Sequence, residues 1–130
     1  MSRTRAAWMI ALLVVAGCTA GGTPGSAAAP GQPRDLITRE QIDGMPVSSA
    51  WEVVQRLRPE FLRPRNPSSS VNRNLAVVYV DGMRRGQPET LRSIPANDVE
   101  EIRFVNAIDA QQRYGPDHTG GVIEIRVRRG

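Results

Sequence analysis

His118 is the only histidine of the 130-residue chain, and imidazole is the side chain best suited to proton transfer near neutral pH. Asp109 and Asp117 lie near it in the sequence, and either could orient its ring or share a weak oxygen-rich metal site with it. A zinc site would need two or three further nitrogen or sulfur ligands, and no serine beside these residues carries a nucleophile-elbow motif. We therefore expect no enzyme, no metal and no cofactor. A small hydrolase using His118 stays a remote alternative.

Arg84 and Arg85 are candidates for contact with another protein. They lie in the segment from Gly82 to Glu89, which we expect to be a connecting loop, and the segment from Pro116 to Thr119 is a second such loop. A guanidinium can bind a carboxylate in bidentate geometry, and flexible neighbouring glycines would help it reach one. We predict Arg84, Arg85 and His118 as partner-binding residues, with His118 exposed in its loop. The alternative is that all three are solubilising loop residues.

The charge distribution argues against nucleic acid. The 17 basic residues are all arginines, and with 13 acids they give a formal net charge of +4. Acids and arginines are interspersed, so no basic block of the kind that binds phosphates is present. Arg126, Arg128 and Arg129 cluster, but they are more typical of a solvated strand face and tail. No glycine spacing matches a dinucleotide or phosphate loop, and no small-molecule substrate can be identified.

The first seventeen residues have the pattern of an export signal. Arg3 and Arg5 precede an apolar run from Ala6 to Val15, which is too short to span a bilayer. Cys18, the only cysteine of the chain, directly follows the small residues Ala16-Gly17. No disulfide can therefore form within the chain.

This arrangement, Val15-Ala16-Gly17-Cys18, resembles the bacterial lipobox. The resemblance implies that residues 1–17 are removed as a lipoprotein signal peptide and that Cys18 becomes an acylated first residue, carrying diacylglycerol and a further acyl chain such as palmitate. Because Thr19 rather than aspartate follows, it also implies sorting to the outer membrane, facing the periplasm. The alternative is a plain secreted protein in which Cys18 is an incidental thiol.

Residues 18–35 are rich in Gly, Ala, Pro, Ser and Thr and have almost no large apolar side chain, so they cannot bury enough surface to fold. We interpret them as a lipidated flexible tether. Residues 36–130 are long enough for one domain with a modest core. The expected organisation is therefore signal peptide, tether and domain.

Hydrophobic spacing predicts the elements of this domain. Trp51, Val54, Leu57 and Phe61 recur at intervals of three and four, which is typical of a helix with one apolar face. In the last strand a strict alternation places Ile123, Ile125 and Val127 inward and Glu124, Arg126 and Arg128 outward. The expected elements are a helical turn from Thr38 to Ile42, a helix from Ala50 to about Arg58, a loop over 64–70, a strand from Leu75 to Val80, a helical turn from Ile94 to Asp98, a strand from Glu101 to Val105, a helix from Ala107 to Arg113 and a strand from Val122 to Arg128.

Strands separated by helical pieces favour an α+β fold, a small mixed sheet with short helices on one face. Three blocks in this order resemble the plug domain of TonB-dependent outer-membrane receptors. The first block is Val77-Val78-Tyr79-Val80-Asp81-Gly82. The second block runs from Leu91 to Ile102 and contains Ile94-Pro95-Ala96-Asn97-Asp98-Val99-Glu100. The third block is Tyr114-Gly115 followed by Gly120-Gly121-Val122-Ile123-Glu124-Ile125.

The resemblance implies a plug-like fold for residues 36–130. No barrel sequence follows Gly130 and no segment before Leu36 resembles the energy-coupling box, so we expect a free-standing relative of a plug. The favoured hypothesis is a lipid-anchored binding or accessory module that docks on an outer-membrane barrel protein. The alternative is a structural or envelope-stress lipoprotein in which the fold is only a scaffold.

Overall fold

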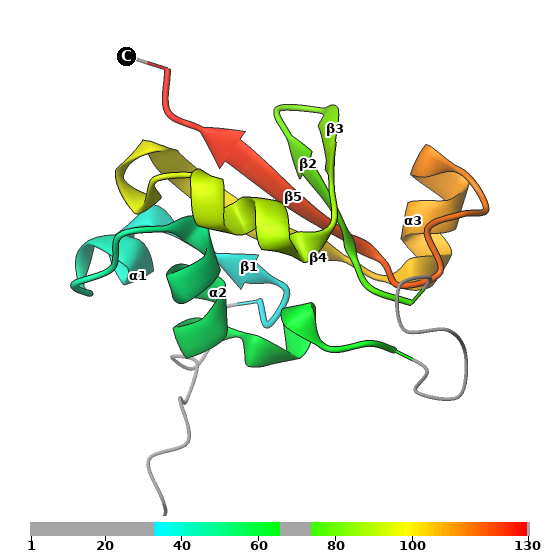
Figure 1. Cartoon of the computed structure of the whole chain (residues 1–130), viewed down its shortest axis with the longest axis horizontal. Coiled ribbons are helices and arrows are strands. Elements are labelled where there is room, and N and C mark those ends of the chain that lie inside the picture. The colour runs from blue at the N-terminus through cyan, green and yellow to red at the C-terminus, as the bar shows by residue number, and fades with distance from the viewer. Residues whose placement is uncertain (1–32, 66–73, 130) are drawn as a thin grey trace, which may run out of the picture.

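Five strands form one mixed sheet in the order β1-β4-β5-β2-β3 in the computed structural model, which describes residues 33–65 and 74–129 (Figure 1). β2 and β5 run parallel, whereas the other neighbouring strands are antiparallel. The strands are β1 (Leu36–Ile37), β2 (Val77–Val80), β3 (Met83–Gly86), β4 (Val99–Val105) and β5 (Val122–Val127). The predicted α+β class with a small mixed sheet is confirmed. The signal peptide, Cys18, most of the tether and part of the predicted loop over 64–70 lie outside the described residues.

Within these described ranges, three short α-helices and three 3-10 helices connect the strands. They are α1 (Arg39–Asp43), α2 (Ala50–Leu57), η1 (Pro59–Leu62), η2 (Pro88–Ser93), η3 (Ala96–Asp98) and α3 (Ala107–Tyr114). Side-chain caps start α2 and α3, because Ser49 Oγ accepts a hydrogen bond from the Glu52 N–H and Asn106 Oδ1 accepts one from the Asp109 N–H. None of the described helices is long and apolar enough to cross a membrane.

The main core lies between α1, α2 and one face of the sheet (Figure 1). Ile123 and Ile125 on β5 are buried, as the alternation predicts, and Arg126 is exposed. On α2 the buried side chains are Ala50, Val53 and Val54, whereas Trp51 is only half-buried. Trp51 nevertheless packs against the main core, as the predicted apolar face requires, and Val53 is a further buried residue that the predicted spacing did not include.

A smaller apolar cluster covers one end of the opposite face. α3 contributes Ala110 and Tyr114, which pack against Tyr79, Val105 and Val122. α1 and α2 cover one face as predicted, while α3 stands at the end of the other (Figure 1). The described elements therefore leave much of this second face uncovered around Glu124 and Arg126 of β5.

The segment from Gly82 to Glu89, predicted as a connecting loop, instead forms β3 and the start of η2. Asp81 and Gly82 have φ angles of 47° and 81°, and positive φ at both central residues defines the type I′ turn of a two-residue hairpin. β3 therefore folds back directly on β2, and the loop prediction is wrong.

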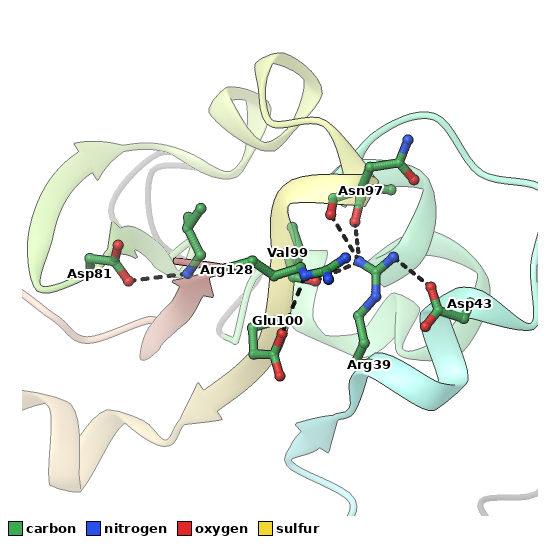
Figure 2. A network of polar contacts seen from close by, with 9 residues as sticks. Arg39, Asp43, Asp81, Asn97, Val99, Glu100 and Arg128 are labelled. Carbon is green, nitrogen blue, oxygen red and sulfur yellow. Dashed lines mark hydrogen bonds and ion pairs between the residues drawn. The ribbon is translucent and has the colours of Figure 1, made fainter. Parts of the chain in front are cut away.

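Polar contacts hold the chain around this hairpin and the first helix (Figure 2). Asp81 Oδ1 accepts a hydrogen bond from the Val127 N–H at 3.1 Å, which fixes the hairpin turn to the end of β5. Arg39 on α1 donates to the carbonyl oxygens of Ala96 at 2.9 Å and Val99 at 2.7 Å, and it is paired with Asp43. Arg39 thereby joins α1 to the start of β4.

Replacing Ile125 by alanine should destabilise the domain by about 2 to 5 kcal/mol, since Ile125 is 2% exposed and its loss leaves a cavity. Arg126→Ala is the matched control on the next residue. It removes only a surface ion pair with Glu101 at 3.3 Å, with an expected cost below about 1 kcal/mol. Urea denaturation of residues 33–130 measures both. A larger loss for Arg126→Ala than for Ile125→Ala would contradict the register of β5.

Candidate partner-binding edge of the sheet

β3 is the outermost strand on one side of the sheet and pairs with β2 alone among the described strands (Figure 1). Its residues are exposed over Met83, Arg84 and Arg85, and 59% of the Met83 surface is accessible. The strand thus presents an edge with unpaired backbone groups, together with two cations. We call the segment Met83–Gly86 the cationic edge.

The two arginines of the cationic edge extend toward different faces of the sheet. Arg84 lies opposite Tyr79 in the β2–β3 register, which places it on the face that α3 partly covers. A bulge follows at Val78 and Tyr79, and Arg85 borders a cavity of about 440 Å³ on the other face, together with Val80 and Val127. The two guanidinium groups therefore flank the strand instead of forming one patch.

No ion pair involves Arg84 or Arg85 within the described part of the chain. The pairs found there join Arg39 to Asp43, Arg126 to Glu101 and Arg128 to Glu100. An exposed cation without a partner in its own domain costs little in water and can bind an external carboxylate. The structure thus leaves the two predicted arginines accessible for a partner.

His118 does not join them, and the prediction that it is exposed is wrong. Its side chain is 5% exposed and makes two hydrogen bonds, from Nε2 to Tyr79 Oη at 3.0 Å and from Nδ1 to the Gly115 carbonyl oxygen at 3.0 Å. A carbonyl oxygen can only accept, so Nδ1 donates, and in the neutral ring Nε2 accepts from the tyrosine hydroxyl. The turn between Gly115 and Gly121 folds the imidazole inward against the rings of Tyr79 and Tyr114.

Asp109 and Asp117 are not among the hydrogen-bond partners that the described residues give His118. Asp109 instead accepts from the Asn106 side chain at the start of α3, and Asp117 is exposed. No group of three or more metal-ligating side chains gathers among residues 33–65 and 74–129. The described residues therefore form neither of the two arrangements considered for His118, a base oriented by an aspartate and an oxygen-rich metal site.

A polar cluster that the sequence analysis missed surrounds the buried histidine. Tyr79 and Tyr114 have ring centroids 4.4 Å apart, and the Tyr114 hydroxyl donates to Glu124 Oε1. Glu124 lies opposite Tyr79 in the parallel β2–β5 register. Burial raises the pKa of Tyr114 to about 12, with further contributions from the hydrogen bond to Glu124 and from its negative charge. The one sequence signal for this cluster is the alternation in β5, which places Glu124 on the face of the sheet opposite the main core.

Tyr114 should ionise near pH 12, well above an ordinary tyrosine. Because its folded pKa is raised, its contribution to stability is complete below about pH 10 and is lost as the pH rises from about 10 through 12. Ultraviolet titration of tyrosinate checks this in a chain with only two tyrosines.

Tyr114→Phe is the control that identifies the high-pH step, which this variant should lack. Glu124→Gln should move the step down, since the carboxylate both accepts the hydrogen bond and opposes the phenolate. Ionisation of both tyrosines near pH 10 in the native protein would contradict this assignment.

The fold and the edge together define a small α+β domain with an open cationic strand at one side of its sheet. No protein-family model matches the chain, and no curated protein is significantly similar to it in sequence.

Proposed function

We propose that this protein is a lipid-anchored, plug-like binding module of the bacterial outer membrane, and that it docks on an outer-membrane barrel protein, one of the TonB-dependent transport class. The observation that carries the proposal is the cationic edge. Arg84 and Arg85 are exposed on an outermost strand and have no ion pair within the described residues. An open strand edge of this kind is a recurrent site for binding an extended segment of another protein.

The resemblance to receptor plugs supports the choice of partner. Each quoted block lies where one element passes into the next. Asp81-Gly82 forms the turn from β2 to β3, the block from Ile94 covers η3 and the start of β4, and Gly120-Gly121 precedes β5. At these positions the fold itself requires particular residues, so the matching blocks support a plug-like fold. The barrel partner is then proposed by analogy with that family.

The lipobox-like sequence supports the location. Cys18 and the described domain, which starts at Pro33, are separated by about fifteen residues, and a chain of that length spans at most ~50 Å. Several acyl chains at one cysteine anchor a protein stably, whereas a single chain is marginal. The domain would then meet partners close to the periplasmic surface of the outer membrane.

Site-specific photocrosslinking in intact cells tests the proposal. A photoreactive residue replaces Arg84 or Arg85 on β3, and the matched control replaces Gln55, which is exposed on α2. We expect adducts to one outer-membrane protein from the two β3 positions and none from Gln55. Absence of a specific adduct at normal abundance of the lipoprotein, or equal adducts from all three positions, would contradict docking through the cationic edge.

A further inference from the structure

We propose that the cationic edge binds its partner by strand addition, and that the added segment is an extended stretch in which acidic and apolar side chains alternate. This inference rests on the proposed function, because it specifies the partner chemistry of the same surface. It is carried by the backbone geometry, the charges and the cavity at β3.

The backbone of β3 has hydrogen-bonding capacity directed outward. Antiparallel pairs alternate between residues that bond to each other and residues that do not. Val80 and Met83 flank the two-residue turn and form the bonded pair, so the N–H and C=O of Arg84 point away from β2. The other edge of the sheet offers less, since β1 has only two residues and Ile37 is fully buried.

The charges select the class of the added strand. Arg84 and Arg85 give the four-residue edge a charge of +2, and Asp81, the acid beside it, is already bonded to the Val127 N–H. A second copy of β3 paired with this edge would bring like charges together, which is unfavourable for directly opposed residues. An acidic segment is attracted by both cations, and its carboxylates can bind Arg84 in bidentate geometry. The edge thus discourages self-association while it attracts an acidic strand.

The cavity beside Arg85 favours an apolar side chain at alternate positions. Val80, Ile94 and Val127 line its apolar part, and Pro95 and Asp98 also border it. Side chains of an added strand alternate between the two faces of the sheet. The face of the segment that lies beside Arg85 would therefore place an apolar side chain at the cavity. The carboxylates on its other face would then reach Arg84, which lies opposite Tyr79 on that face.

The experiment measures binding of synthetic peptides to the full-length lipidated protein in detergent micelles. The first probe is a fluorescent peptide of alternating glutamate and valine. The second replaces every glutamate by lysine, and the third keeps the glutamates but is N-methylated at every residue, so that it cannot donate main-chain hydrogen bonds. Fluorescence anisotropy gives the affinities, and amide hydrogen exchange of Arg84 reports on its outward N–H.

We expect the glutamate peptide to bind at least tenfold more tightly than either other probe and to slow exchange of the Arg84 amide. The double variant Arg84→Glu/Arg85→Glu should reverse the preference toward the lysine peptide. Arg63→Glu/Arg113→Glu makes the same change in net charge at exposed positions elsewhere and should keep the native preference.

Equal binding of the N-methylated peptide would overturn strand addition, and equal binding of the lysine peptide would overturn the acidic specificity. Failure of the glutamate peptide to bind at all would overturn this inference. Crosslinks from β3 to an outer-membrane protein in cells would still support the proposed docking function in that case. The two experiments therefore test the docking function and the strand-addition mode separately.

Discussion

Gly120→Ala should destabilise the domain by about 3 kcal/mol or more, at the upper end of what overpacking costs. An alanine Cβ at this position would overlap with the carbonyl group of Leu75 and lie 2.5 Å from the carbonyl oxygen of Asn74. Both are backbone groups, so no side chain can rotate to make room. The chain before β2 would have to separate from the chain before β5, where Val77 donates to the Gly121 carbonyl at 3.0 Å.

Gly44→Ala is the matched control. At Gly44 φ is −74°, and the nearest atoms to an added Cβ lie at 3.7 and 3.8 Å, which is ordinary contact. This substitution should be neutral or should stabilise the domain by up to about 1 kcal/mol, because alanine lowers the conformational entropy of the unfolded chain. Thermal denaturation of residues 33–130 should show a midpoint lower by about 12 °C or more for Gly120→Ala. A midpoint within two degrees or so of the native one would contradict the close approach before β5.

Cys18→Ser should abolish the proposed lipid anchor. A serine hydroxyl cannot take the thioether-linked lipid, so the variant should carry no lipid label and should not be cleaved by the lipoprotein peptidase. Fatty-acid labelling and membrane fractionation of cells measure this, and Ser26→Ala in the same tether is a control that should leave both unchanged. Recovery of the native protein and the variant in equal amounts from the soluble periplasm would contradict the lipobox interpretation.

Sequence patterns predicted the parts of the fold that local chemistry determines. The alternation in β5 correctly placed Ile123 and Ile125 in the core, because only one face of that strand meets α2 and its neighbours. The helix predicted from Ala50 begins there, capped by the neighbouring Ser49. In both cases the information lies within a few residues of the feature it predicts.

The errors arose where distant segments decide the outcome. β3 carries Met83, two arginines and a glycine, so it has no apolar alternation, and only the Asp81-Gly82 turn indicated that the chain folds back. His118 has a loop sequence around it, yet Tyr79, thirty-nine residues away, supplies the hydroxyl that makes its burial favourable. No local pattern contains that partner. For the candidate site, the sequence indicated Arg84 and Arg85 as partner-binding residues. It did not indicate that they lie on an outermost strand, because that depends on the order of strands in the sheet.

Affinity purification of the full-length protein in mild detergent tests the central claim most directly. We predict that an outer-membrane barrel protein copurifies in stoichiometric amount with the native protein and with Arg63→Glu/Arg113→Glu, and that Arg84→Glu/Arg85→Glu loses it while remaining folded and membrane-bound. Absence of a stoichiometric barrel partner, or its full retention by the Arg84→Glu/Arg85→Glu variant, would contradict a lipid-anchored module that docks through its cationic edge.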